Sequence, residues 1–439
     1  MDVRYSKPIE LKTVDVFVAG GGPAGIAAAV TAARQGKKVL IVESTGCFGG
    51  AGTSGLVPMF CSFGNGVDFL AGGIGAEVCQ AHFGECDSRD ELRPIRVEEL
   101  KRLYDKMIKD SGAEFLFFTS LTDVVCDREG HVDYVVCVNK GGLFAVKAGV
   151  YLDCTGDGDL CAKAGADFLF GDDDGLTMGS SLCQLWANID WSRVLPNDDR
   201  KLEEAIADGV FQVPDRHLAG IYRVGETVGG GNVGHVFGVN STDPRSLTDA
   251  MVEGRRYVAD YHRFYREYLE GYEKVELVST ASSLSVRESR RIVGDYTMKL
   301  DDFIRRASFE DEIGRYNYKV DIHESKPTLE DHEKFKETFH TLWYYPGESY
   351  GIPYRALIPK KLSNVLVAGR CISADRPMQS SVRIMACCFI TGQAIGMAGS
   401  MTADSGDVRS VSVPELQRRL AEMGAFLPNN KPGNGGEDR

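Results

Sequence analysis

The stretch from Val14 to Glu43 constrains the fold more than any other part of the chain. Its sequence is VDVFVAGGGPAGIAAAVTAARQGKKVLIVE: an apolar run, a glycine-rich turn, an alanine-rich run that stops at Gly36, and a second apolar run. This order predicts a strand, a helix and a second strand parallel to the first. Such a βαβ unit predicts a doubly wound α/β domain with a Rossmann-type nucleotide site.

The glycines of this unit have the spacing of a dinucleotide-binding turn. Gly20 permits the tight turn, Gly22 lets a pyrophosphate approach the backbone, and Gly25 lets the helix and strand pack closely. Pro23 and Ala24 fall in the first helical turn, whose N–H groups are free to bind phosphates. We therefore predict that these five residues bind the phosphates of a dinucleotide.

Glu43 supplies the acidic residue that such a site needs. It follows the second strand, 18 residues after Gly25, where a carboxylate accepts hydrogen bonds from a ribose, and we place Ser44 beside it in the site. The glycine pattern recurs at residues 50–55 and 229–234, but without a preceding apolar strand or a later acidic residue. Glycine-rich turns without a ligand explain these two matches, so we predict one dinucleotide site.

Charge and composition argue against several kinds of partner. The net charge of −13 leaves no basic excess to neutralise nucleic-acid phosphates. The N-terminal segment lacks the apolar core of a secretory signal, and the apolar stretches are too short to span a membrane, so we expect a cytoplasmic protein without a membrane partner. The twelve cysteines include no C-x-x-C pair, so we predict no metal site and no disulfide.

The segment after Glu43, STGCFGGAGTSG, is rich in glycine, serine and threonine and leaves many backbone N–H groups free for a ligand. Here the chain resembles the FAD-dependent oxidoreductases of the glutathione-reductase-like superfamily, in particular the bacterial FAD dependent oxidoreductase family. The resemblance implies FAD as the cofactor, with this turn against its ribityl chain and isoalloxazine ring. The matching residues are Gly49, Gly50, Ala51, Thr53 and Ser54.

Two segments before residue 170 extend the resemblance. Short apolar runs at about 121–126, 132–138 and 143–147 predict a β-meander inserted in the nucleotide domain, and the resemblance implies that Val124 passes the adenine. A buried strand at 150–154 then ends in Thr155, Gly156 and Asp157, at the edge where parallel sheets bind ligands. The resemblance implies that this turn returns to the cofactor; an acidic turn that caps a helix is the alternative.

The last segment of the resemblance rebuilds the nucleotide domain. Gly369 and Arg370 follow a buried strand at 364–368, and Ser381 and Val382 are predicted to open an apolar helix that runs to about residue 401. The resemblance implies that this helix N-terminus faces N1 and the C2 carbonyl of the flavin and stabilises negative charge there, reinforced by Arg383. Residues 374–380 depart from the family, so the choice of substrate does not carry over.

The candidate catalytic residues lie in the second half of the chain. Arg287, in the family signature RESRRI, is able to hold an anionic group, with surface ion pairing as the alternative. His323 ends a predicted strand at 318–323, where the family carries D-I-H; we predict a catalytic base, with a structural role as the alternative. Tyr354 and Arg355 are predicted to orient the substrate.

Together these features predict an α/β protein: a Rossmann-type FAD-binding domain with an inserted β-meander, and an interleaved α+β substrate domain. We expect the FAD-binding domain at residues 1–170 and 346–405, the substrate or cap domain at 171–345, and a C-terminal helix and disordered tail at 406–439.

The predicted activity is hydride transfer from a C–H bond of a small hydroxylated, sugar-like substrate to flavin N5. A flavin-dependent C=C reductase and a non-catalytic electron-relay subunit are the alternatives. The electron acceptor stays open among oxygen, a quinone, NAD(P) and a protein, and a homo-oligomer is possible. Covalent attachment of FAD is also open, because Cys47 and Cys61 lie near the flavin turn in the sequence.

Overall fold

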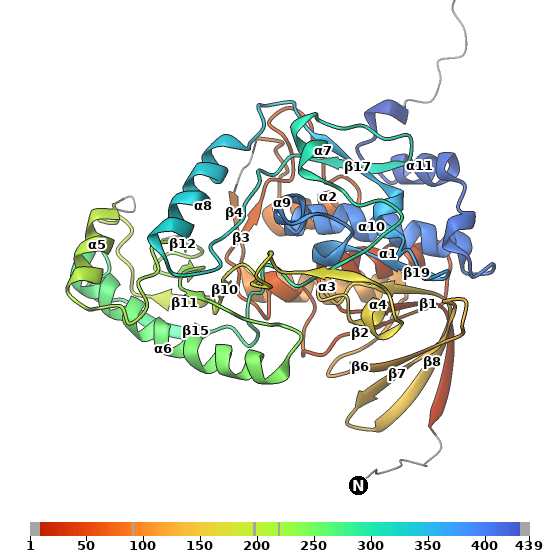
Figure 1. Cartoon of the computed structure of the whole chain (residues 1–439), viewed down its shortest axis with the longest axis horizontal. Coiled ribbons are helices and arrows are strands. Elements are labelled where there is room, and N and C mark those ends of the chain that lie inside the picture. The colour runs from red at the N-terminus through yellow and green to blue at the C-terminus, as the bar shows by residue number, and fades with distance from the viewer. Residues whose placement is uncertain (1–8, 90–91, 196–198, 218–219, 431–439) are drawn as a thin grey trace, which may run out of the picture.

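A seven-stranded sheet organises one side of the molecule, and a smaller four-stranded sheet lies on the other side (Figure 1). The computed structural model describes residues 9–89, 92–195, 199–217 and 220–430. The predicted α/β class is confirmed, with a Rossmann-type sheet and a second region.

The predicted βαβ unit is confirmed and forms the centre of the large sheet. It consists of β1 (Glu10–Ala19), α1 (Pro23–Arg34) and β2 (Val39–Val42), and the two strands pair in parallel. The helix ends where the sequence predicts, because Gly36 takes a φ of 78°, which a glycine adopts without strain.

The large sheet has the order β5-β2-β1-β8-β7-β6, with β19 pairing to β8. Its remaining strands are β5 (Glu114–Leu116), β6 (Ser120–Cys126), β7 (Val132–Asn139), β8 (Gly142–Asp153) and β19 (Val365–Val367). The β1, β2, β5, β8 and β19 pairings are parallel, whereas the β6–β7 and β7–β8 pairings are antiparallel.

The predicted β-meander is confirmed: β6, β7 and the first half of β8 form it, and it is part of the large sheet. The runs predicted at 143–147 and 150–154 form one strand, β8, whose first half pairs with β7 and whose second half pairs with β19. Gly149 does not interrupt the strand. A side chain there would overlap the carbonyl oxygen of Ala403, so glycine is needed for close packing and not for a turn.

Helices cover the face of the sheet that carries α1. The long helix α10 (Met385–Thr402) packs against α1, and Gly392 and Gly396 bring its backbone onto that of Ala24 and Ala28. The sequence predicts one helix from Ser380 to about residue 401, and this prediction is wrong. A short helix, α9 (Arg376–Val382), precedes α10, and the two are bent by 90° at Arg383 and Ile384.

The second region contains the four-stranded sheet and its own buried core around Trp186. Its sheet has the order β12-β13-β11-β15: β11 (Gln184–Ala187), β12 (Ile221–Arg223), β13 (Gly229–Gly231) and β15 (Glu276–Thr280). Helices α5 (Asp199–Ala207) and α6 (Pro244–Tyr268) lie against it on the left of Figure 1. The expected domain boundaries stay a prediction.

The remaining helices and strands complete the two regions. The helices are α2 (Ile74–Phe83), α3 (Val97–Ser111), α4 (Asp159–Lys163), α7 (Leu300–Ile304), α8 (Leu329–Thr341) and α11 (Val413–Glu422). The strands are β3 (Met59–Cys61), β4 (Leu92–Pro94), β9 (Phe168–Phe170), β10 (Ser180–Ser181), β14 (His235–Val236), β16 (Arg290–Ile292), β17 (Glu312–Tyr316) and β18 (Tyr350–Pro353). Of the predicted tail, Pro428–Asn430 form a 3-10 turn, and 431–439 lie outside the described residues.

Among the described helices, none alone has the length and apolar composition that a membrane crossing requires. The bent pair of α9 and α10 meets those two criteria when its helices are taken together. In this structure α10 is buried along most of its length, against α1 and the large sheet.

Candidate active site

The ends of four parallel strands place the predicted cofactor residues along one edge of the large sheet. β1 ends at Ala19, β2 at Val42, β8 at Asp153 and β19 at Val367, and each strand is followed by one of the predicted loops. Parallel sheets bind their ligands at this edge. The loops after β1 and β8 touch, because a Cβ on Gly20 would lie 2.5 Å from the carbonyl oxygen of Cys154.

The N-terminus of α1 has the features of a phosphate site. Gly22 is its N-cap residue, no side chain caps the helix, and Pro23 stands in the first turn. A Cβ on Gly22 would meet no protein atom within 4 Å, so the space in front of this end is open. Free N–H groups and the positive end of the helix dipole favour an anion here. The residues present therefore fit a dinucleotide pyrophosphate.

Glu43 connects the phosphate turn to the end of β2. Its Oε2 accepts a hydrogen bond from the Gly21 N–H at 2.7 Å, and its Oε1 accepts from the Thr45 N–H at 2.8 Å and from the Ser44 hydroxyl at 3.3 Å. Carboxylate oxygens have further lone pairs, which remain able to accept from a ribose hydroxyl. Glu43 is therefore placed both to hold the turn and to bind a ribose.

The predicted flavin turn lies directly against this site. The Gly49 N–H donates to the Gly21 carbonyl oxygen at 2.8 Å, and a Cβ on Gly50 would lie 3.3 Å from Gly22 Cα. The turn is held internally by two hydroxyl groups: Thr53 donates to the Phe48 carbonyl oxygen and Ser54 to that of Gly50. Ala51, which follows Gly50 in this turn, is exposed.

The turn after β8 is joined to the turn after β19 by one arginine. Arg370 donates to the carbonyl oxygen of Gly156 at 2.8 Å and to Oδ1 of Asp157 at 2.7 Å, and Thr155 donates to the buried Asp153 at 2.8 Å. Gly369 lies close to α1, since a Cβ added at Gly369 would be 3.2 Å from Cβ of Ala24. Four loops that are distant in the sequence therefore line one edge.

Ser381 has other surroundings than the sequence suggests, whereas the place of Val124 along the adenine stays a prediction. Val124 lies within β6, and its side chain belongs to the same buried cluster as Val42. The backbone of Glu43 bonds to that of Leu116 and Thr119. Ser381 is fully buried at the end of α9, where its hydroxyl bonds to the Tyr350 hydroxyl and the Tyr318 carbonyl oxygen.

The helix end near the flavin turn is that of α10 and not the predicted one at Ser380–Val382. α10 begins at Met385 without a side-chain cap, and Gly52 of the flavin turn would place a Cβ 3.1 Å from Met385 Sδ. Arg383 lies at the bend between α9 and α10. Its Nη2 donates to Oδ2 of Asp321 at 2.7 Å and connects this bend to the segment that carries His323.

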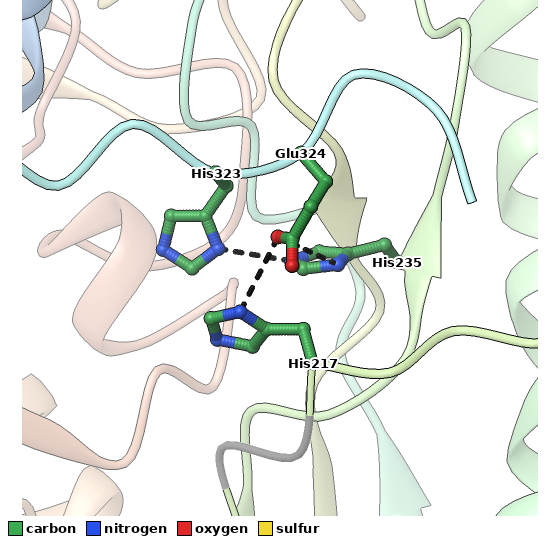
Figure 2. A group of neighbouring side chains, drawn as sticks. All are labelled: His217, His235, His323 and Glu324. Carbon is green, nitrogen blue, oxygen red and sulfur yellow. Dashed lines mark hydrogen bonds and ion pairs between the residues drawn. The ribbon is translucent and has the colours of Figure 1, made fainter. Parts of the chain in front are cut away.

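A buried cluster of three histidines and one glutamate lies beyond Asp321 (Figure 2). Its members are His217, His235, His323 and Glu324, which we call the histidine cluster. His235 belongs to β14, whereas the other three lie in irregular segments, so His323 does not end a strand as predicted: β17 stops at Tyr316.

Carboxylates fix the orientation of two rings in the histidine cluster. His235 Nδ1 lies 3.3 Å from Oδ1 of Asp215, and His323 Nε2 lies 3.3 Å from Oδ2 of Asp321. An ionised carboxylate only accepts hydrogen bonds, so these two ring nitrogens carry the hydrogens. The other nitrogens, His235 Nε2 and His323 Nδ1, lie 3.0 Å apart. With both rings neutral and their hydrogens on the carboxylate side, these two nitrogens present lone pairs to each other.

The pKa values in this cluster follow from burial and charge. Burial lowers the pKa of both His235 and His323 below the ordinary value, against the opposing effect of their aspartates. Burial alone would raise the pKa of Asp321, but His323 and Arg383 hold that pKa well below its usual range. The rings are therefore neutral and Asp321 is ionised at neutral pH.

Arg287 adds a buried cation near this cluster. It is only 5% exposed, and its guanidinium donates to the Gly179 carbonyl oxygen, the Ser181 hydroxyl and Oδ1 of Asn232. Among the described residues no carboxylate lies within ion-pair distance of it. Burial, and then the positive charge of Arg383, lowers the pKa of Arg287 to about 10. A buried cation with neutral partners is suited to bind an anionic group.

Tyr354 and Arg355 are held by structural partners, and their roles in orienting a substrate stay a prediction. The Tyr354 hydroxyl, on a 2% exposed residue, donates to the Val408 carbonyl oxygen. Arg355 pairs with Asp311 and lies over the Tyr296 ring. Neither side chain bonds to the described residues of the histidine cluster.

Several residues of this site carry no signal in the sequence. His217 and His235 are isolated histidines in irregular sequence, and Asp215 and Gln379 stand in no recognised motif. Gln379 donates to the carbonyl oxygens of Arg287 and Arg370 and so connects the two halves of the site. Only the sequence DIHE, with two acidic residues around His323, was a local signal for the cluster.

The Cys61 thiol lies beside the Tyr318 side chain, and burial raises its pKa to about 11. The thiolate is the reactive form, so its fraction rises with pH up to about 11 and is small at pH 8. We expect alkylation of Cys61 by iodoacetamide to be slow at pH 8 and to accelerate about tenfold per pH unit up to pH 10. Peptide mass spectrometry measures the rate, with Cys61→Ser protein as the control; fast labelling at pH 8 would contradict this prediction.

Comparison with known proteins agrees with this geometry. A family model described as FAD dependent oxidoreductase matches residues 15–420. No curated protein matches the chain.

Solved structures with a similar fold share little sequence with this chain. A geranylgeranyl bacteriochlorophyll reductase-like protein from Thermoplasma acidophilum is 12% identical, with a TM-score of 0.47, over 94% of this chain and 83% of that one. A flavin-dependent brominase is 13% identical, with a TM-score of 0.47, over 94% and 83%. The p-nitrophenol 4-monooxygenase of Pseudomonas putida DLL-E4 is 11% identical, with a TM-score of 0.46, over 95% and 87%. At these scores the similarities carry no argument about the reaction.

Proposed function

Because this chain belongs to the FAD dependent oxidoreductase family, we propose that it oxidises a small hydroxylated, sugar-like substrate by hydride transfer from a C–H bond to the flavin. FAD is the cofactor of the family, and the edge formed by Gly22, Glu43, Gly50 and Gly369 has the geometry to hold it. The substrate and the direction of the reaction belong to the proposal.

The facing nitrogens of His235 and His323 carry this proposal. They lie 3.0 Å apart, and the opposite nitrogen of each ring is bonded to a carboxylate. Two neutral imidazoles in this arrangement accept one proton between them, and the proton turns a repulsive contact into a hydrogen bond. Oxidation of an alcohol requires a base that takes the hydroxyl proton, which is what this pair provides.

The proposed reaction breaks two bonds of the substrate. The hydroxyl proton passes to Nδ1 of His323 as the carbon–oxygen double bond forms, and the hydride leaves the same carbon. FAD, when bound, supplies the acceptor for the hydride and its two electrons, and an external electron acceptor later removes them. Asp321 holds the His323 ring in the tautomer that accepts the proton and stabilises the positive charge that results.

Arg287 and Arg383 have supporting roles in this proposal. The guanidinium of Arg287 is buried among neutral groups, so it is placed to hold an oxygen of the substrate on which negative charge develops. Arg383, at the bend before α10, donates a hydrogen bond to Asp321 and so fixes its position. It therefore positions the base without itself taking a proton.

An anaerobic screen tests the direction of the reaction. FAD-loaded protein is mixed without oxygen with a panel of sugar-like alcohols, and the visible absorbance of the oxidised flavin is followed. We expect at least one alcohol to bleach it. The opposite outcome, in which alcohols have no effect and an alkene restores the colour of dithionite-reduced protein, would replace alcohol oxidation by C=C reduction. Bleaching by neither class would support an electron-relay subunit.

A further inference from the structure

We propose that His217, His235, His323 and Glu324 bind a divalent transition-metal cation such as Zn²⁺. The starting observation is the 3.0 Å contact between His235 Nε2 and His323 Nδ1. Both nitrogens present lone pairs, because the other nitrogen of each ring faces a carboxylate. Two bare lone pairs at this distance repel each other unless a positive charge lies between them. A metal cation supplies that charge in the absence of a substrate proton.

The other two candidate ligand atoms, His217 Nδ1 and Glu324 Oε2, face each other at 3.3 Å, the ion-pair contact drawn in Figure 2. Both atoms are buried, and neither has a further hydrogen-bond partner within the described part of the chain. With zinc–nitrogen bonds of about 2.0–2.1 Å, neighbouring ligands of a tetrahedral zinc are about 3.3–3.4 Å apart. Both pairs of atoms are thus near the spacing that an ion imposes.

One ligand atom from each of the four residues lies within 4.8 Å of the others. This limit exceeds a tetrahedral edge, so binding of an ion would draw the ligands together. His217 lies in an irregular segment, and its side chain is 13% exposed. Three imidazole nitrogens and one carboxylate oxygen form a donor set that zinc and its first-row neighbours prefer over calcium or magnesium.

A second layer of side chains holds the ligands as in known metal sites. Asp215 and Asp321 accept the outward N–H groups of His235 and His323. His332 Nδ1 bonds to Oε1 of Glu324 at 2.7 Å and leaves Oε2 directed at the other ligands. Metal-binding histidines and carboxylates are usually oriented by such partners. Each of these three ligands therefore has its oriented partner already in place.

The cation and the substrate proton would use the same atom. Nδ1 of His323 cannot hold both, so a bound ion should slow reduction of the flavin by a substrate alcohol. Only this consequence rests on the proposed function. Binding of the ion is a property of the four side chains and does not require any substrate.

Zinc binding is therefore measured directly, on full-length protein loaded with FAD. The protein is treated with a chelator, dialysed against Zn²⁺ and analysed by atomic emission, and the affinity is obtained by calorimetric titration. We expect one zinc ion per chain and a higher melting temperature with zinc than without. The Glu324→Gln and His217→Gln proteins should bind at least about 10–100-fold more weakly.

A matched control separates this site from other histidines. His131 bonds to Ser363, just before the start of β19, and no described contact connects it to the histidine cluster, so His131→Gln should bind zinc as the wild type does. Near-UV circular dichroism establishes which variants are folded. The proposal is overturned if folded wild-type protein binds less than about a tenth of an ion per chain, or if a folded Glu324→Gln or His217→Gln protein retains the wild-type affinity. Zinc binding without any alcohol oxidation would leave the metal site standing and remove the proposed function.

Discussion

Replacement of Gly22 by valine should give a protein that folds normally and is purified without FAD. The backbone of Gly22 has a φ of −70°, which any residue adopts, and a Cβ there would meet no protein atom within 4 Å. The valine methyl groups would instead fill the open space at the N-terminus of α1. Loss of two hydrogen bonds to a charged pyrophosphate, at about 1.5–3 kcal/mol each, corresponds to at least a 100-fold weaker binding.

The flavin-to-protein absorbance ratio after purification measures this effect, and titration of the apoprotein with FAD gives the affinity. Gly25→Ala is the matched comparison in the same turn, because a Cβ there would overlap the carbonyl oxygen of Gly20. That variant should lose about 1–3 kcal/mol or more of unfolding free energy, so any loss of FAD in it would come from reduced stability. Full flavin occupancy in a folded Gly22→Val protein would show that the phosphates do not lie at this helix end.

The nucleotide half of the fold was predictable because its determinants are local. The glycines at 20, 22 and 25, Pro23 in the first turn and Gly36 after the helix each act on a few neighbouring residues, and α1 begins and ends where they predict. The strand boundaries at Val39–Val42 follow in the same way from one short apolar run. Such signals do not depend on what packs against the unit.

The errors occurred where tertiary contacts decide the local structure. Gly149 looks like the end of a strand, but it leaves room for the Ala403 carbonyl oxygen within a continuous β8. The bend between α9 and α10 has no proline or glycine at Arg383 and Ile384 to reveal it. Arg383 instead pairs with Asp321, a residue 62 positions earlier in the chain. A short local stretch of sequence therefore does not contain both Arg383 and Asp321.

The histidine cluster could not be predicted for the same reason. Its four residues come from three segments, and His217 and His235 have neither the spacing of a metal motif nor a catalytic signature. His323 was singled out through the resemblance, and the structure adds its partners Asp321 and His235. Its catalytic role stays a prediction. The partners of Tyr354 and Arg355, Val408 and Asp311, are distant in the sequence and could not be predicted from it.

Arg383 links the flavin turn to the histidine cluster through very few residues. On the flavin side, Gly52 touches the start of α10, which begins two residues after Arg383. On the other side, Arg383 bonds to Asp321, and Asp321 orients His323. In the proposed function, the base His323 therefore lies on one side of this arginine and the flavin turn at Gly52 on the other. This arrangement allows the two transfers of an alcohol oxidation to be tested separately.

We expect His323→Asn protein to retain FAD but to lose most of its rate of flavin reduction. Asparagine keeps an N–H group for Asp321, but it has no basic nitrogen to face His235. General-base catalysis contributes about 10²–10⁴-fold, so the rate constant should fall by that factor for the alcohol that reduces the wild-type flavin in the screen. Anaerobic stopped-flow absorbance measures this single turnover, and the flavin-to-protein ratio should equal that of the wild type.

His332→Gln provides the control for this experiment. His332 is also buried and bonds to Glu324, yet it takes no part in the His235–His323 contact. Its replacement should change the reduction rate by less than about tenfold, because no proton-accepting atom is removed. If His323→Asn and His332→Gln slow the flavin equally, the effect arises from disturbed packing. If neither variant slows reduction of the flavin, the facing nitrogens of His235 and His323 are not required for hydride transfer. The hydroxyl proton of the substrate then leaves by another route.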